Sequence, residues 1–234
     1  MSRPRVTLKL ATSLDGRIAT ASGESRWITG PAAREAVHRL RAMHAAVLVG
    51  VETAIADDPQ LTVRFPGFLG LQPVRAVLDS RQRLPSATRL VTDAHRLDTV
   101  VVTAVAPKSR LTDAGVAVLQ VAEHEGRVAV HAALAALGEH LRERLRRAFP
   151  KANVGPDAEV GPVLVEGGGQ VAASLLEADL VDAIEWFRAP IVLGDEGRPA
   201  VGAFVVKALA DAPRFRRTAV RDVGPDLWES YERL

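Results

Sequence analysis

Short apolar runs alternate with helical patterns along this whole chain, and no other feature of the sequence constrains the fold as strongly. Runs rich in β-branched residues predict strands at residues 6–11, 46–50, 74–78, 99–103, 116–121, 163–166, 182–188, 213–223 and 228–231. Helices are expected from Gly30-Pro31 onward, over residues 131–149 and from the glycines after residue 166 to about 178. The sequence therefore predicts an α/β fold whose mostly parallel central sheet has helices on both faces and an antiparallel C-terminal edge.

Composition narrows the class of protein. Apolar residues make up 47% of the 234 residues and charged residues 25%, which is ordinary for a packed globular chain. The absence of cysteine excludes disulfides, thiolate metal sites and a cysteine nucleophile. Neither a signal peptide nor an apolar run of about 18 residues occurs, so we expect a cytoplasmic protein without a membrane segment. We expect one domain over residues 1–234, with one flexible connection at 150–162, which contains Lys151, Asn153, Gly155 and Pro156.

The net charge is only +2, from 30 basic and 28 acidic residues. Such a balance argues against a dedicated nucleic-acid binder, whose charge gathers on one face. One helical stretch is rich in charge and contains Arg142, Arg144, Arg146 and Arg147 beside Glu139 and Glu143. We interpret it as a solvated helix end with cations near the negative C-terminus, and a phosphate-binding patch is the alternative.

The sharpest local signal is the segment 163–172, in which an apolar strand leads into three glycines and then a helix. Glycines let backbone amides approach a ligand, and a helix N-terminus offers unpaired N–H groups to a phosphate. Gly167, Gly169 and Ala172 also satisfy a relaxed GxGxxA dinucleotide pattern. A plain tight turn would need only one or two glycines, so we favour ligand binding. Glu166 ends the strand where ligands bind in parallel sheets, and a helix-capping carboxylate is the alternative.

A second cluster lies in residues 50–64. Thr53 and Asp57 are four residues apart, so one helical turn would place them on one face until Pro59 ends it. Arg64 lies just beyond and can reach back as a fork for phosphate. The adjacent Asp57 and Asp58 have no histidine or third carboxylate nearby in the sequence, so we expect no metal.

The third cluster follows the first strand and covers residues 13–17 and 23–29. Asp15-Gly16 is a strong turn signal. Trp27 either stacks on a flat ring or fills the core. Serine hydrolysis and zinc hydrolysis lack support, because the sequence contains neither a GxSxG elbow nor an HExxH motif.

Taken together and in this order, the clusters resemble the reductase domain of the bifunctional riboflavin biosynthesis protein. The resemblance covers nearly the whole chain and is carried by residues 9–17, 22–29, 40–41, 53, 57–64, 79–80, 166–169 and 224–226. It implies a dihydrofolate-reductase-like fold and a homodimer. It also implies reduction, with NADPH, of 5-amino-6-(5-phosphoribosylamino)uracil, a small phosphorylated pyrimidine, to its ribitylamino product.

The resemblance also implies site residues. NADPH contacts would fall at Ala11, Trp27, Thr53, Asp57, Ser80 and across residues 168–174, and we assign the glycine loop to the cofactor as Gly167, Gly168, Gly169, Gln170 and Val171. Substrate contacts would fall at Ser25, Arg41, Leu61, Arg64 and Glu166. Arg41 and Arg64 suit the 5-phosphate of the substrate. The ionisable candidates for proton handling are Lys9, Asp57 and Glu166. Ser80, Arg81 and Arg83 are candidates for the 2′-phosphate of NADPH, with a solvated loop as the alternative.

The chain departs from the family pattern in two places. The bifunctional protein carries a zinc deaminase with His and Cys ligands, whereas this chain has no cysteine. We therefore expect no deaminase domain here and a separate deaminase. Thr12 stands where the bacterial motif commonly has alanine, near the expected nicotinamide. A free-standing reductase also resembles the archaeal and fungal enzymes, which act on the diaminopyrimidinone before deamination, but residues 23–28 look bacterial and favour the uracil. The other readings are a reductase of the same fold acting on a pteridine or folate-like substrate, and a non-catalytic nucleotide-binding module.

Overall fold

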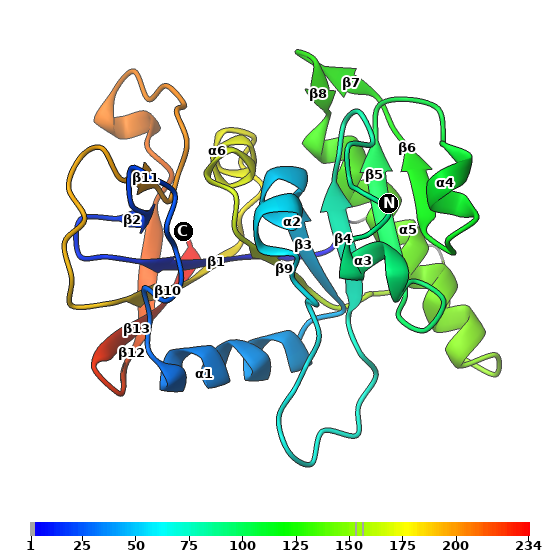
Figure 1. Ribbon diagram of the computed structural model, residues 1–234, viewed down its shortest axis with the longest axis horizontal. Helices are drawn as coiled ribbons and strands as arrows, with labels where there is room; N and C mark the ends of the chain where they lie inside the picture. The colour runs from blue at the N-terminus through cyan, green and yellow to red at the C-terminus, as the bar shows by residue number, and fades with distance from the viewer. Residues whose placement is uncertain (1–2, 153, 156) are drawn as a thin grey trace. The chain divides into compact units, whose positions relative to one another are not determined.

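The computed structural model describes residues 3–152, 154–155 and 157–234, drawn in colour in Figure 1. The chain forms two compact units. Unit 1 comprises residues 1–5 and 41–163, and unit 2 comprises residues 6–40 and 164–234. Each unit combines segments that are far apart in the sequence, so a search for a change in composition along the chain could not find them. The single domain expected over residues 1–234 stays a prediction.

Unit 1 is built on four parallel strands, which lie in the order β3 (Ala46–Gly50), β4 (Val74–Leu78), β5 (Thr99–Thr103) and β6 (Ala117–Gln120). Every residue of β3 and β5 is buried, as expected of parallel strands covered on both faces. One face packs against the short helices α2 (Val51–Asp57), α3 (Arg89–Thr92) and α4 (Ser109–Thr112). The long helix α5 (Val130–Ala148) buries Leu134, Leu137 and Leu141, and Figure 1 shows it behind these strands.

Unit 2 contains the strand order β12 (Phe215–Val223), β13 (Asp226–Arg233), β10 (Ala183–Arg188), β1 (Val6–Thr12) and β9 (Val163–Glu166), whose first residue belongs to unit 1. β1 and β10 are parallel, whereas β13 runs antiparallel to both β10 and β12. Helix α1 (Pro31–Ala42) begins at the predicted proline and buries Ala33, Ala36, Val37 and Leu40. Helix α6 (Gly169–Glu177) follows β9 directly.

The smaller elements join loops together. In unit 1, β7 (Glu123–His124) and β8 (Arg127–Val128) form a hairpin. In unit 2, β2 (Arg17–Ala19) pairs with β11 (Arg198–Pro199), and a single 3₁₀ turn, η1, covers Leu209–Asp211. None of the helices in the described part of the chain is long and apolar enough to cross a membrane.

The predicted fold class is confirmed, since parallel pairs dominate and the antiparallel strands lie at the C-terminal edge. The last strand is longer than the predicted 228–231, because Gly224 with φ of 70° closes a hairpin and β13 begins two residues later. The shortest helices and strands were not predicted, because they are too short to show a period. The described residues between 150 and 162 contain neither helix nor strand, and Asn153 and Pro156 lie outside the described residues.

The prediction of a solvated helix end is wrong for Arg142. This side chain lies on the buried stripe of α5 and is 1% exposed, with its guanidinium 3.0 Å from Glu139. The neighbouring arginines are more exposed and are also ion-paired, Arg146 with Glu139 and Glu143, and Arg147 with Glu143. An arginine can be buried when an acidic partner one turn away compensates its charge, and the sequence pattern alone did not separate it from its neighbours.

Candidate functional site

The glycine loop of unit 2 connects β9 to α6. Gly167 and Gly168 have φ of 81° and 89°, a conformation that residues with side chains rarely adopt. The Ala172 N–H donates to the Gly168 carbonyl over 3.0 Å, so the N–H groups of Gly169, Gln170 and Val171 precede the first intrahelical bond. A Cβ on Gly169 would lie 2.8 Å from the Pro199 carbonyl oxygen. Three consecutive glycines are therefore required by the backbone, and the amides after them have the arrangement that binds a phosphate.

Glu166 immediately precedes this loop as the last residue of β9. It is only 9% exposed. The predicted position at the carboxyl end of a buried strand is confirmed, and the carboxylate lies next to the glycines in the sequence.

Three residues at the carboxyl end of β1 lie on different faces of the sheet, because side chains alternate along a strand. Lys9 and Ala11 are half-buried and project from one face, whereas Thr12 is fully buried and projects from the other. The Trp186 indole N–H donates to Thr12 Oγ1 over 2.8 Å, and this hydroxyl donates to the Ser13 carbonyl over 2.8 Å. Thr12, which stands where the family commonly has alanine, therefore makes an internal hydrogen bond in unit 2 and projects from the opposite face to Ala11.

The turn after β1 is fastened by Asp15. Its carboxylate accepts hydrogen bonds from the Ser13 hydroxyl and from the N–H groups of Leu193 (3.1 Å) and Gly194 (2.8 Å). The Ser13 hydroxyl, followed by these two amides, lowers the pKa of Asp15 to about 2. Gly16 adopts φ of 75°, which confirms the predicted Asp-Gly turn. The sequence marked Asp15 only as a turn residue, and its second role of holding residues 193–194 was missed.

The loop that follows presents Ser25 half-buried and Trp27 exposed. The Trp27 side chain is 69% exposed, so the alternative that it fills the core is wrong. The Arg34 guanidinium lies 4.4 Å from the centroid of its ring, a cation–π contact. An exposed indole can stack on a flat ring, which was the other reading.

Helix α2 of unit 1 carries Thr53 and Asp57. Both are half-buried and lie one turn apart on the same face, as predicted. The helix ends because Asp58 adopts φ of 40° and is followed by Pro59. The Asp58 carboxylate accepts a hydrogen bond from the Arg89 N–H over 2.8 Å and so caps the start of α3. Asp58 thus has a structural role, and no group of three or more His, Asp or Glu side chains suited to a metal occurs among the residues that the structure describes.

Arg41 and Arg64 meet at Thr62 in unit 1. Arg41 Nη1 donates to the Thr62 carbonyl over 3.0 Å, and Arg64 Nη1 donates to the Thr62 hydroxyl over 3.4 Å and to Gln60. Leu61, with φ of 53°, is 2% exposed and anchors this turn. The two guanidinium groups predicted to bind one phosphate are therefore brought to the same residue. Thr62, which links them, was missed because a lone threonine carries no sequence signal.

Ser80 follows β4 in unit 1, and its hydroxyl accepts the Val128 N–H of β8 over 3.0 Å. Arg81 lies 3.2 Å from Glu123 of β7, and Arg83 lies 2.6 Å from Glu52 of α2. The hydrogen bond and charge of Glu52 raise the pKa of Arg83. Both arginines are about half exposed, so each loop cation has one carboxylate partner and remains accessible to solvent.

Comparison with known proteins agrees with these motifs. The family model of the RibD C-terminal domain matches residues 4–146 and 156–228. The riboflavin biosynthesis protein RibD of Escherichia coli (strain K12) is 34% identical over an alignment of 235 positions, which covers 96% of this chain and 58% of that protein. The chain thus spans little more than half the length of the curated relatives it matches.

Solved structures are similar over the same span. Acinetobacter baumannii RibD (form 2) has 30% sequence identity and a TM-score of 0.77, covering 99% of this chain and 58% of that one. A Thermotoga maritima diaminohydroxyphosphoribosylaminopyrimidine deaminase/5-amino-6-(5-phosphoribosylamino)uracil reductase has 26% identity and a TM-score of 0.71, covering 99% and 57%. On the family match, the identity and the shared strands, this chain belongs to the RibD C-terminal domain family and has its reductase, dihydrofolate-reductase-like α/β fold.

Proposed function

We propose that this chain reduces 5-amino-6-(5-phosphoribosylamino)uracil to its ribitylamino product with NADPH, a step of riboflavin biosynthesis. Membership of the RibD C-terminal domain family supports the proposal, and the name of the Thermotoga maritima relative includes this reductase activity. The observation that carries it is the meeting of Arg41 and Arg64 at Thr62. Two guanidinium groups that contact one residue supply the positive charge and the N–H donors that suit a phosphate monoester such as the substrate's 5-phosphate.

The residues of unit 2 fit the phosphates of a dinucleotide cofactor. The glycine loop offers the amides of Gly169, Gln170 and Val171 at a helix N-terminus, where backbone dipoles favour negative charge. A Cβ at position 169 would collide with the Pro199 carbonyl, so only glycine allows the backbone to lie this close to residue 199. We assign the cofactor to Ala11, Trp27 and the residues 167–171 of unit 2, and to Thr53, Asp57 and Ser80 of unit 1.

Preference for NADPH over NADH is assigned to Arg81 and Arg83. Both follow Ser80, both are about half exposed, and each already has one carboxylate partner. A 2′-phosphate carries more negative charge than the hydroxyl that it replaces, so accessible guanidinium groups would favour NADPH.

When bound, NADPH supplies the hydride that reduces the first carbon of the sugar. The residues of this chain bind and orient the substrate and handle the accompanying proton. Lys9 and Glu166 are the candidates in unit 2, and Asp57 is the candidate in unit 1. Glu166 is 9% exposed, which suits a carboxylate that orients a substrate group away from bulk water. Ser25, Leu61 and Glu166 complete the proposed substrate contacts with Arg41 and Arg64.

The experiment follows NADPH oxidation with enzymatically prepared phosphoribosylaminopyrimidines, one deaminated and one not. Turnover of the deaminated compound is the expected result. Preference for the diamino compound would assign the chain to the substrate used by archaeal and fungal reductases. Turnover of dihydrofolate alone would transfer the proposal to a folate-like substrate, and NADPH binding without any oxidation would refute the enzymatic proposal.

The proposal includes a homodimer and a cytoplasmic location. The homodimer rests on the family resemblance, and sedimentation velocity at several protein concentrations tests it. A single species with the mass of one chain at every concentration would contradict it. The location rests on the cytoplasmic supply of phosphorylated intermediates and cofactor, and cell fractionation tests it.

A further inference from the structure

The long connection between α2 and β4 contains Arg64 and Thr62, and Arg41 of α1 contacts Thr62. Residues 58–73 of this connection contain neither helix nor strand, so regular backbone pairing does not hold them. Yet Leu61, Thr62 and Val63 are all less than a tenth exposed. Contacts other than secondary structure must therefore order residues 62–64.

The side chain of Gln72 adds to the ordering that burial of Leu61 and Val63 provides. Its Oε1 accepts the Val63 N–H over 2.8 Å, and its Nε2 donates to the Val63 carbonyl over 3.1 Å. The amide thus pairs with both backbone groups of the residue between Thr62 and Arg64, as a neighbouring strand would. Both ends of the amide are used, so its orientation is defined by the two bonds.

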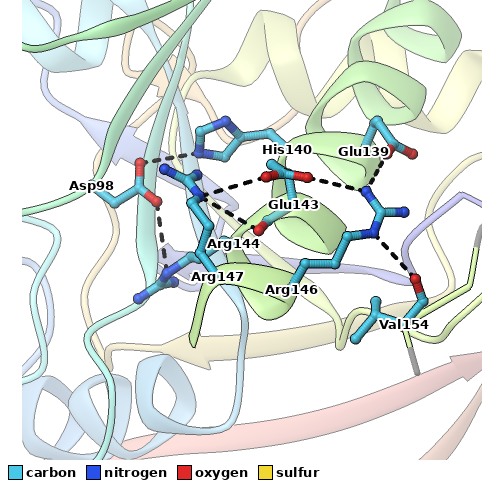
Figure 2. Close-up of polar contacts among 8 residues, drawn as sticks. All are labelled: Asp98, Glu139, His140, Glu143, Arg144, Arg146, Arg147 and Val154. Atoms are coloured by element: carbon cyan, nitrogen blue, oxygen red, sulfur yellow. Dashed lines mark hydrogen bonds and ion pairs between the residues drawn. The ribbon is translucent and has the colours of Figure 1, made fainter. Parts of the chain in front are cut away.

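Gln72 is itself held from α5. Its backbone carbonyl accepts a hydrogen bond from Arg144 Nη2 over 2.7 Å. Arg144 Nε lies 3.6 Å from Asp98, and Asp98 lies 3.0 Å from His140 Nε2 (Figure 2). Figure 2 shows His140 and Arg144, one turn apart on α5, both directed at this carboxylate. Arg144 is therefore fixed at its other contact and presents a defined donor to Gln72.

We propose that Gln72 is a positioning residue for phosphate binding, acting through Val63 on the arginine pair, and that Arg144 supports it from α5. This inference rests on the proposed function, since it assumes that Arg41 and Arg64 bind the substrate phosphate. A phosphate that meets two preordered guanidinium groups avoids the entropy cost of ordering the loop on binding. Without the amide clamp, the Thr62–Arg64 segment keeps its burial and the hydrogen bond from Arg41, but the ligand must supply the ordering that Gln72 provides.

The test compares Gln72→Met, which nearly preserves side-chain length but cannot make either bond, with the wild-type chain. Titration calorimetry with D-ribose 5-phosphate as the probe reports the arginine pair without turnover. We expect the dissociation constant to rise about tenfold, the equivalent of two neutral hydrogen bonds. With the pyrimidine substrate, KM should rise to a similar extent while kcat and the dissociation constant for NADPH change less than about twofold.

Gln82→Met is the matched control. Gln82 is 1% exposed and forms the same kind of clamp elsewhere in unit 1, donating to the Ala106 carbonyl over 2.7 Å and accepting the Lys108 N–H over 2.8 Å. Its loss should lower the melting temperature and leave the affinity for ribose 5-phosphate unchanged. Arg144→Met keeps the side-chain amide of Gln72 and removes both the donor to the Gln72 carbonyl and the contact with Asp98. It should weaken the binding of ribose 5-phosphate by about threefold, and it provides a second variant if Gln72→Met does not fold.

The outcomes separate the two proposals. If the wild-type chain fails to bind ribose 5-phosphate, or if Arg64→Ala binds it equally well, the phosphate assignment is wrong and the role of Gln72 is refuted with it. If Arg64→Ala loses the probe while Gln72→Met and Arg144→Met bind like the wild type, only the role of Gln72 is overturned. Equal weakening in Gln72→Met and Gln82→Met would reduce the effect to general destabilisation and would also overturn it.

Discussion

A buried guanidinium in unit 1 gives the sharpest prediction about stability. Arg75 of β4 is completely buried, and burial lowers its pKa to about 10 against the opposing charges of Asp93 and Asp98. Its Nη1 donates to the Arg89 carbonyl over 3.2 Å. Its Nη2 donates to the Leu90 carbonyl over 3.1 Å, to the Leu97 carbonyl over 3.3 Å and to the Thr99 hydroxyl. One side chain thereby joins α3, the following turn and the start of β5.

Replacing Arg75 by Met removes these donors while keeping an unbranched apolar stem. The Arg89 and Leu97 carbonyls keep the Asp93 N–H and the Thr99 hydroxyl as other donors, whereas the Leu90 carbonyl loses its guanidinium donor. Hydrogen bonds to a charged group contribute ~1.5–3 kcal/mol each, and an unsatisfied buried acceptor costs ~1–3 kcal/mol. Relief of the desolvation of the cation offsets part of this loss. We expect a net loss of about 3 kcal/mol in the free energy of unfolding.

Urea denaturation followed by far-UV circular dichroism measures the change. With a slope of ~3 kcal/mol/M for a chain of this size, the midpoint should fall by about 1 M. Arg96→Met is the control, because Arg96 is 81% exposed and pairs with Asp93 on the surface, so its loss should cost less than ~1 kcal/mol. If the two variants differ by less than ~0.5 kcal/mol, the reasoning that buried carbonyls depend on Arg75 is refuted.

Four further predictions concern the candidate site and its support. Arg64→Ala should weaken the binding of the phosphorylated substrate by ~1.5–3 kcal/mol in an equilibrium titration, and unchanged affinity would reject the phosphate assignment. The double change Arg81→Ala with Arg83→Ala should weaken NADPH much more than NADH, measured by cofactor fluorescence, and an equal loss for both would exclude the 2′-phosphate assignment. Gly169→Ala should weaken NADPH and lower the melting temperature, because its Cβ would lie 2.8 Å from the Pro199 carbonyl, whereas Gly155→Ala meets nothing within 4 Å and should change neither. Burial opposes ionisation of Asp98, but His140, Arg144 and Arg147 hold its pKa below the usual value. Asp98→Asn should therefore lower the free energy of unfolding by its full amount at pH 7. The difference from the wild type should shrink as the pH falls below about 4, and a difference independent of pH in parallel urea titrations would contradict this linkage.

Much of the fold could be predicted because the signals are local. The β-branched runs at 46–50, 74–78 and 99–103 became buried parallel strands at the predicted residues. Pro31 began α1, and three glycines placed the start of α6 within one residue. Family motifs named the arginine pair and the glycine loop, and the spacing of Thr53 and Asp57 predicted their shared helix face. The strand, helix and turn predictions depend on residues that are neighbours in the chain, whereas the arginine pair was named from the family resemblance.

Only the tertiary structure identified the contacts that hold these parts in place. Gln72 reaches Val63, Arg144 reaches Gln72 across more than seventy positions of sequence, and Asp15 holds the amides of Leu193 and Gly194. The sequence pattern favoured a solvated arginine at position 142, and the structure buries it together with Arg75. The physical reason is that apolar residues recur every two to four positions in strands and helices, so these elements can be predicted from the sequence alone. The satisfaction of a buried polar group depends on which distant atoms surround it, and folding alone determines that.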